Sequence, residues 1–219
     1  MIDALLKPFR APTPGWPEST REVQLVSGTR LHLRPLRAAD GDAWISTRLA
    51  DEAWLKPVEP TAPSTWEAAH THAAWRNTWL NLKRLAADGV VVPLVIEADG
   101  QFAGQVTLGN IQHGAVGECW IGYWVHSPFM GRGIATAACA LGVDHAFHRV
   151  GMHRVTATFL PSNPASGSVL KACGFREEGF MRRNLHIDGE WRDHYFVALN
   201  CDDFPSDAVD RLATAGRLR

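Results

Sequence analysis

The sequence predicts an α+β (mixed α/β) domain built on a central mixed, mostly antiparallel sheet with helices on both faces. Three observations carry this prediction. Strand patterns occur in both halves of the chain, and helix patterns separate them. Three consecutive strand patterns within residues 90–125 are joined by short turns, which makes them antiparallel neighbours. The order strand, helix, strand between residues 119 and 160 predicts one crossover connection, and such a connection places two strands in parallel.

The first ninety residues are expected to supply a hairpin and two helices. Residues 23–36 alternate around a Ser-Gly pair, which is typical of a short hairpin or of a strand that enters the core. Asp40 is expected to cap a helix that runs to about Ala50. The sequence Ser-Thr-Trp-Glu at 64–67 has the form of a capping box. The Ala- and Leu-rich stretch behind it predicts one long helix up to residue 88, before a glycine.

Strand and helix patterns alternate along the rest of the chain. Glycine-containing turns separate the strands, and the main helix opens after a glycine-rich segment. The expected elements are strands at 90–97, 102–112 and 119–125, a helix from Gly133 to about His148, a strand at 154–160, a short helix at 165–173, and strands at 175–183 and 191–199.

The chain is expected to hold a single domain between two extensions. Residues 1–22 predict an extended N-terminal arm, because four prolines forbid a continuous helix there. These are Pro8, Pro12, Pro14 and Pro17. No second linker of this kind interrupts residues 23–204, which are expected to form one domain. Residues 205–219 are expected to form a C-terminal helix or tail.

Composition excludes several classes of protein. The 219 residues are 46% hydrophobic and 21% charged, which is an ordinary globular composition. A net charge of -1 provides no strongly basic surface, so direct binding to nucleic acid is not expected. The four cysteines form no CxxC pair, so reduced thiols and no metal site are expected. Because no signal-peptide core and no apolar run of roughly 20 residues is present, the protein is expected to be cytoplasmic, without a membrane partner.

A glycine-rich turn between a strand and a helix is the strongest candidate for a binding site. Gly131 and Gly133 let the backbone approach a ligand closely, and the helix that begins there contributes the partial positive charge of its N-terminus. Backbone N–H groups and the charge of Arg132 predict a phosphate-bearing ligand. The P-loop pattern is absent, and a dinucleotide fingerprint would need glycine where Thr136 stands.

Two segments in this order resemble the GCN5-related N-acetyltransferase (GNAT) superfamily. Residues 130–135, Met-Gly-Arg-Gly-Ile-Ala, match its Arg/Gln-x-x-Gly-x-Gly/Ala loop, except that Met130 replaces the usual Arg or Gln. The exchange matters little, because a phosphate there rests on backbone N–H groups. Residues 163–175 match the Asn-x-x-Ser helix and the Gly-Phe that follows it. The resemblance extends from about Leu33 to Phe204.

Four shorter motifs are similar to the RimJ-like branch of this superfamily, the ribosomal-protein alanine N-acetyltransferases. They are Ile-Gly-Tyr-Trp at 121–124, His-Arg-Val at 153–155, Gly-Phe-x-x-Glu-Gly at 174–179 and Trp-Arg-Asp-His at 191–194. The resemblance implies the GNAT fold, in which two neighbouring parallel strands splay apart and acetyl-CoA lies in the gap as cosubstrate.

The resemblance also implies which residues hold acetyl-CoA. The loop and the helix after it would bind the diphosphate, and the end of the central strand would pair with the pantetheine arm. Lys171 would reach the 3′-phosphate or remain solvated. The implied binding residues are Trp124, Val125, His126, Met130, Gly131, Arg132, Gly133, Ile134, Ala135, Thr136, Asn163, Ser166 and Lys171.

Catalytic roles are implied for a smaller set. The Val125 N–H would stabilise the oxyanion. Relatives often carry an acidic tyrosine where Leu170 stands, so Ser166 is the expected acid unless it only caps its helix. Glu118 is a candidate base, with His194 and Asp193 as rivals.

The expected activity is transfer of an acetyl group from acetyl-CoA to a primary amine by direct attack. The resemblance favours the N-terminal amine of a protein, in particular a ribosomal protein, and a monomer or a homodimer. Two alternatives remain: an acetyltransferase for a small amine such as an amino acid, polyamine or antibiotic, and a non-catalytic acyl-CoA sensor, which the missing tyrosine at Leu170 keeps open.

Overall fold

The computed structural model describes residues 13–219, so Pro8, Pro12 and most of the expected arm lie outside the described residues. One sheet of eight strands runs through the described chain in the order β1-β2-β3-β4-β5-β6-β8-β7. The strands are β1 (Val23–Gln24), β2 (Arg30–Pro35), β3 (Val92–Ala98), β4 (Gln101–Gln112), β5 (Glu118–Val125), β6 (Arg154–Phe159), β7 (Arg176–Ile187) and β8 (Glu190–Asn200).

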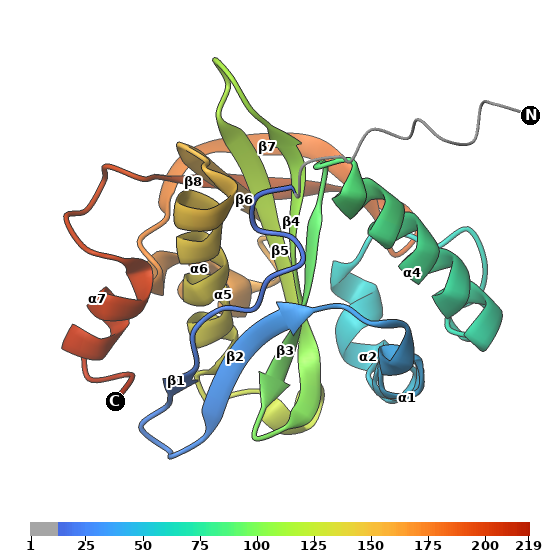
Figure 1. The fold of residues 1–219 in the computed structure, drawn as a ribbon. Coiled ribbons are helices and arrows are strands. Elements are labelled where there is room, and N and C mark those ends of the chain that lie inside the picture. Colours follow the sequence, from blue (N-terminus) through green and yellow to red (C-terminus); the bar gives the residue numbers. More distant parts are fainter. Residues whose placement is uncertain (1–12) are drawn as a thin grey trace, which may run out of the picture.

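Helices cover both faces of this sheet (Figure 1). They are α1 (Gly41–Ala50), α2 (Glu52–Leu55), α3 (Trp66–Ala69), α4 (His72–Ala87), α5 (Ile134–His145), α6 (Pro164–Ala172) and α7 (Ala208–Thr214). A π-helical turn at Ala146–Val150 continues α5. Helices α5, α6 and α7 lie on one side, and α1, α2 and α4 lie on the other. The predicted mixed α/β architecture is therefore confirmed.

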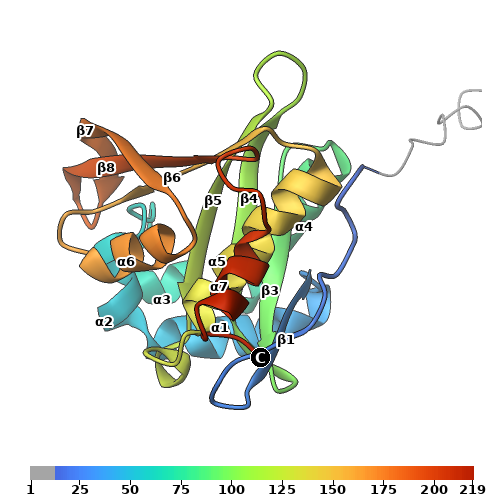
Figure 2. The same ribbon diagram turned by 90° about the vertical axis from the view of Figure 1, so that its left-hand side faces the viewer.

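The sheet divides between β5 and β6. All neighbouring strands are antiparallel except this pair, as the single crossover predicted. Only the first three residues of β5, Glu118–Trp120, pair with β6, whereas β5 continues to Val125 and β6 continues along β8 to Phe159. Figure 2 shows the β6–β8–β7 part of the sheet turned away from β5. The structure thus contains the splayed parallel pair that the resemblance implied.

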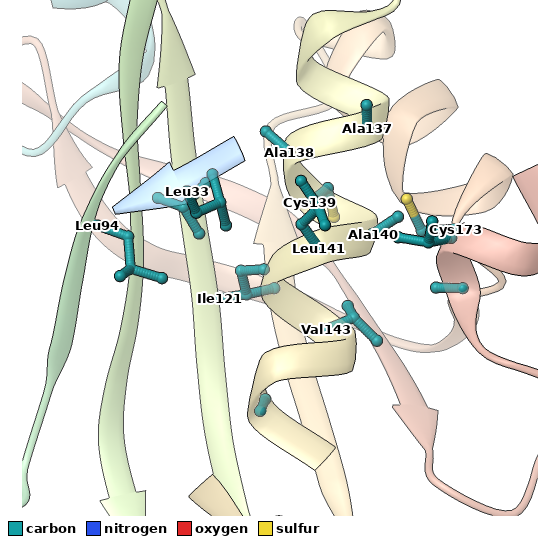
Figure 3. Close-up of a cluster of buried hydrophobic side chains, with 14 of the residues drawn as sticks. Leu33, Leu94, Ile121, Ala137, Ala138, Cys139, Ala140, Leu141, Val143 and Cys173 are labelled. Atoms are coloured by element: carbon teal, nitrogen blue, oxygen red, sulfur yellow. The ribbon is translucent and has the colours of Figure 1, made fainter. Parts of the chain in front are cut away.

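Helix α5 forms the centre of the core. Its buried side chains belong to one hydrophobic cluster with Leu33, Leu94 and Ile121 from three strands (Figure 3). Small residues let the helix approach the sheet, because a Cβ atom on Gly142 would lie only 2.9 Å from Cδ1 of Ile121. This close contact packs α5 against β5, and the start of α5 and the end of β5 border the candidate site.

The predicted long helix at residues 64–88 is wrong in one respect, because two helices replace it. Thr65 caps α3 by accepting a hydrogen bond from the Ala68 N–H, and α3 ends at Ala69. Thr71 then caps α4 by accepting from the Ala74 N–H. Between them the buried side chain of His70 turns inward, so a second cap and a buried polar side chain interrupt the helix.

Asp40 does not cap α1 with its side chain as predicted. Its carboxylate instead accepts two hydrogen bonds from the Arg34 guanidinium, at 2.8 and 3.0 Å, and one from the Arg37 N–H at 2.7 Å. Arg34 also binds Glu97 at 2.5 Å. The buried guanidinium competes successfully for Asp40 because a charge-assisted pair is stronger than a neutral cap.

Both chain extensions contact the domain where the structure describes them. Thr20 exchanges hydrogen bonds with Leu33 of β2, and His145 binds the Gly15 carbonyl at 2.8 Å. Helix α7 is held by Asp144, which accepts from the Ala208 and Val209 N–H groups. Among residues 13–219, no helix has the length and apolar character that crossing a bilayer requires.

Candidate functional site

The glycine-rich loop has the backbone geometry of an anion cradle. Gly131 and Gly133 have φ values of 71° and 82°, a left-handed conformation that glycine adopts without strain. The first helical hydrogen bond of α5 runs from the Ala137 N–H to the Gly133 carbonyl. The N–H groups of residues 134–136 therefore have no partner within the helix and point out of its N-terminus.

Arg132 lies at this loop but is tethered. Its Nη2 donates to Oγ1 of Thr29 in the turn between β1 and β2 at 3.0 Å, and its guanidinium lies 5.8 Å from the Phe129 ring centre. Met130 beside it is exposed. A pocket of about 350 Å³ adjoins the loop on this side. Its lining is Leu25, Val26, Ser27, Arg132, Gly133, Thr136, Ala137, Leu212, Gly216, Arg217 and Leu218.

The end of β5 presents backbone groups to the gap between β5 and β6. The His126 N–H donates to the Ala103 carbonyl on β4 at 2.8 Å. Because successive residues of a strand alternate their hydrogen-bonding side, the N–H and C=O groups of Ile121, Tyr123 and Val125 face away from β4. Strand β6 pairs with none of these three residues. The predicted oxyanion donor, Val125, thus lies on the open edge.

Asp51 anchors the connection between β5 and the loop. This carboxylate is 1% exposed and accepts from His126 Nδ1 at 2.7 Å and from the Ser127 N–H at 2.8 Å. Burial alone would raise the pKa of Asp51, but the hydrogen bonds from Ser127 and His126 outweigh it and hold that pKa below its ordinary value. No sequence motif singled out Asp51, because it lies 75 residues before its partner.

A second buried cluster fixes Trp124 on the opposite face of β5 from α5. The Arg48 guanidinium lies 5.1 Å from the ring centres of Trp44 and Trp66 and 5.2 Å from that of Trp124. We call these four residues the Arg48 cage. Such stacking is favourable for a guanidinium that is largely removed from water.

Polar partners complete the Arg48 cage. Arg48 pairs with both carboxylate oxygens of Glu59, and its Nε donates to Nε2 of His70 at 2.6 Å. Burial lowers the pKa of His70, and its Nδ1 donates to the Trp66 carbonyl at 2.6 Å. A neutral His70 can therefore accept from Arg48. The cage ties α1, α3 and the 56–60 segment to the strand that borders the gap.

Helix α6 brings the Asn-x-x-Ser motif to the same gap. Asn163 caps the helix, because its Oδ1 accepts from the Ser166 N–H at 3.2 Å. Ser166 is therefore not the capping residue, and its Oγ lies 3.1 Å from the Tyr123 hydroxyl. Leu170 is buried in the core, and Lys171 is exposed. The Tyr123 contact was not foreseen, although the residue belongs to the Ile-Gly-Tyr-Trp motif.

The three candidate bases differ in their surroundings. Glu118 lies in the paired part of β5, outside the open edge, and accepts from Arg154 at 3.1 Å. Asp193 accepts from the Arg183 N–H at 2.7 Å. His194 is 3% exposed, and its Nδ1 lies 3.1 Å from the Arg192 carbonyl, which leaves Nε2 available.

Residues that could hold a metal ion lie apart from this arrangement. In the described part of the chain, one group has suitable spacing: the exposed side chains of His153, Cys201 and Asp202, whose ligand atoms lie within 4.8 Å of one another. They stand at the start of β6 and the end of β8, beside the paired ends of β5 and β6. The open edge and the loop involve none of them.

The geometry can be compared with known proteins. The family model described as "Acetyltransferase (GNAT) domain" matches residues 30–176. A solved structure of Mycobacterium smegmatis RimJ in complex with CoA-disulfide is 45% identical, with a TM-score of 0.92, and the match covers 94% of this chain and 98% of that one.

Two curated proteins are also similar. The [Ribosomal protein uS5]-alanine N-acetyltransferase of Escherichia coli (strain K12) is 30% identical over 201 residues, which are 87% of this chain and 97% of that protein. The probable N-acetyltransferase YjcK of Bacillus subtilis (strain 168) is 42% identical over 107 residues, 48% of this chain and 59% of that protein. The family match spans the glycine-rich loop, the open edge of β5 and the Asn-x-x-Ser helix of this chain, and the chain belongs to the GNAT family of acetyltransferases.

Proposed function

We propose that this acetyltransferase moves an acetyl group from acetyl-CoA to the N-terminal amine of a ribosomal protein. The observation that carries the proposal is the continuity of the open β5 edge with the cradle at the start of α5. A diphosphate suits the cradle, and an amide-bearing chain suits a strand edge. The similarity to the uS5-alanine N-acetyltransferase over 87% of this chain supports the choice of acceptor.

The residues of the site fit coenzyme A as follows. Backbone N–H groups of residues 131–136 receive the diphosphate, flanked by Met130 and Arg132. The open edge at Tyr123 and Val125 pairs with the pantetheine amides, which satisfies backbone groups that would otherwise lack partners. Trp124 and His126 are fixed on the other face of the strand by the Arg48 cage and by Asp51. Asn163 shapes the start of α6, from which Lys171 extends.

The reaction needs three contributions from the protein. The amine attacks the thioester carbonyl, the carbonyl oxygen acquires negative charge, and sulfur leaves as the C–S bond breaks. We assign the Val125 N–H, which lies on the open edge, as the donor to that oxygen. A base takes the proton that the nitrogen loses, and an acid supplies a proton to the departing sulfur.

We assign the acid to Ser166. Replacing Ser166 by alanine is expected to lower kcat by roughly 10²-fold, the scale of a lost general acid, and to leave the Kd for coenzyme A nearly unchanged. Steady-state kinetics and calorimetry measure the two quantities. Ser168→Ala is the matched control, because within residues 13–219 the Ser168 hydroxyl has the Pro164 carbonyl as its one hydrogen-bond partner, on an exposed side of α6. Equal losses of kcat and coenzyme A affinity in Ser166→Ala would reduce Ser166 to a binding role.

We assign the base to His194 in preference to Glu118 and Asp193, whose carboxylates already accept hydrogen bonds. Burial lowers the pKa of His194, so its Nε2 stays unprotonated at lower pH than in an ordinary histidine. His194→Gln is expected to lower kcat/KM roughly 10²-fold and to remove the acid limb of its pH profile, a limb that lies below the ordinary histidine pKa of about 6.5. An unchanged acid limb would exclude His194.

The function itself is tested by release of free thiol from acetyl-CoA. The acceptors are peptides copied from ribosomal-protein N-termini, the same peptides with a blocked α-amine, and the small amines spermidine and alanine. Release with the free peptides only, with the acetyl group located on the α-nitrogen by mass spectrometry, is the expected result. Preferential acetylation of small amines would overturn the acceptor assignment, and tight coenzyme A binding without release to any amine would indicate a sensor.

A further inference from the structure

Tyr123 connects the open edge of β5 to α6, the helix that carries the proposed acid Ser166. Its phenol oxygen lies 3.1 Å from Oγ of Ser166 and 3.2 Å from the Ser166 carbonyl oxygen. The tyrosine belongs to β5 and the serine to α6, two segments 43 residues apart in the chain. Its backbone faces the gap, while its ring lies on the α5 side of the strand. Tyr123 is therefore part of the open edge and also contacts Ser166, the proposed acid.

The phenol is a permanent hydrogen-bond donor. Burial raises the pKa of Tyr123 well above its ordinary value, so the hydroxyl keeps its proton throughout the range in which an acetyltransferase is assayed. A phenol has one proton, which it can give to the Ser166 carbonyl or to Oγ. When Oγ accepts it, the proton of the serine hydroxyl must point elsewhere.

Asn163 does not bind the Ser166 hydroxyl, so Asn163 does not determine how that hydroxyl is oriented. Its Oδ1 accepts from the backbone N–H of Ser166 and makes no contact with Oγ. Among residues 13–219, the Ser166 hydroxyl has Tyr123 as its one hydrogen-bond partner. The direction of the serine proton therefore depends on Tyr123. Leu170, one turn further along α6, supplies no hydroxyl.

We propose that Tyr123 is a positioning residue that donates to Oγ of Ser166 and so directs the serine proton toward the departing sulfur. The inference rests on the proposed function of Ser166 as acid. As the C–S bond breaks and its electron pair passes to sulfur, the Ser166 proton moves to that sulfur. His194, the proposed base, takes the proton that the amine nitrogen loses and releases it to solvent, and the serine regains a proton from solvent. Tyr123 itself keeps its proton throughout.

The experiment is a double-mutant cycle in the full-length chain, with Tyr123→Phe, Ser166→Ala and the double variant. Tyr123→Phe keeps the ring and removes the hydroxyl. It is expected to lower kcat about tenfold, the effect of one hydrogen bond, with unchanged KM for acetyl-CoA and unchanged Kd for coenzyme A. In the Ser166→Ala background the same change is expected to alter kcat less than twofold, because the oxygen it acts on is gone.

Tyr195→Phe is the matched control, since Tyr195 is the second of the two tyrosines in the chain. Its ring stacks on Phe159, with 5.1 Å between ring centres, and a phenylalanine keeps that contact. We expect wild-type kcat for this variant. Ser166→Thr, which retains a hydroxyl, is expected to restore sensitivity to Tyr123→Phe.

The outcomes separate a positioning role from a structural one. If Tyr123 only holds β5 to α6, its loss lowers kcat by the same factor with and without the serine hydroxyl, and raises KM as well. That result, or wild-type kcat in Tyr123→Phe, overturns the inference while leaving the proposed function intact. A wild-type protein that acetylates no amine defeats the proposed function before the cycle is needed.

Discussion

Replacing Gly133 by valine is expected to weaken coenzyme A binding at least about 100-fold without unfolding the protein. Gly133 has a φ of 82° and precedes α5, where backbone N–H groups form the cradle. A β-branched residue disfavours this conformation by about 1–3 kcal/mol, so the loop relaxes and the N–H groups diverge. Loss of one or two hydrogen bonds to a charged diphosphate, at about 1.5–3 kcal/mol each, accounts for the weaker binding. Calorimetry with coenzyme A measures it.

Gly151→Val controls for backbone strain. Gly151 has a φ of 80°, and a Cβ atom there would meet nothing within 4 Å, while at Gly133 it would make only an ordinary contact of 3.7 Å with Cδ2 of Leu25. It follows the π-helical turn behind α5, at the end of the helix that lies away from the cradle. Both variants should lose similar amounts of stability, but Gly151→Val should bind coenzyme A normally. Wild-type affinity in Gly133→Val would contradict the position of the diphosphate.

Replacing Arg48 by alanine is expected to lower the free energy of unfolding by about 3 kcal/mol, because it leaves the partly buried carboxylate of Glu59 without the counter-charge of the buried Arg48 guanidinium. The Arg48 side chain is 9% exposed and that of Glu59 is 23% exposed. The change also removes the cation from between three tryptophan rings. Urea unfolding, followed by tryptophan fluorescence, measures the loss.

Arg21→Ala is the control for this prediction. Arg21 pairs with Asp210 at 2.8 Å, but both side chains are more than half exposed, so its loss should cost at most about 0.5 kcal/mol. A combined Arg48→Met and Glu59→Gln variant is expected to recover much of the lost stability, since it removes both charges together. If Arg48→Ala were no less stable than Arg21→Ala, the cage would contribute nothing to the fold.

The fold could be predicted from sequence because its determinants are local or periodic. Short stretches of sequence indicate the individual elements: Gly133 marks the start of a helix, and alternating apolar residues mark the strands. The order of these elements predicts the crossover. The predictions failed where a charged side chain that the local rule does not consider bound the residue concerned. Asp40 fits a cap by sequence, yet Arg34 and Arg37 claim its carboxylate. His70 fits a helix interior, yet Arg48 draws its side chain inward.

The backbone features of the site could be predicted from the sequence, but its long-range side-chain contacts could not. Its cradle and the Asn163 cap rest on backbone conformation, which short motifs record. Tyr123, Asp51 and the Arg48 cage depend on contacts between segments far apart in the chain, and one sequence contains no signal for such pairs. Folding alone brings Ser166 of α6 and Arg48 of α1 against β5, and Asp51 against the segment that follows β5.

Arg154 lies where the β1–β5 part of the sheet and the β6–β8–β7 part begin to separate. From the first residue of β6, this one side chain reaches Glu118 on β5, Glu178 on β7 and Asn200 on β8. The gap between β5 and β6 widens toward Val125. At its closed end the two strands are held by three pairs of backbone partners and also by the ionic contacts of Arg154. The separation of β5 and β6 at the proposed reaction site is therefore determined in part by Arg154, a residue at the opposite end of the gap.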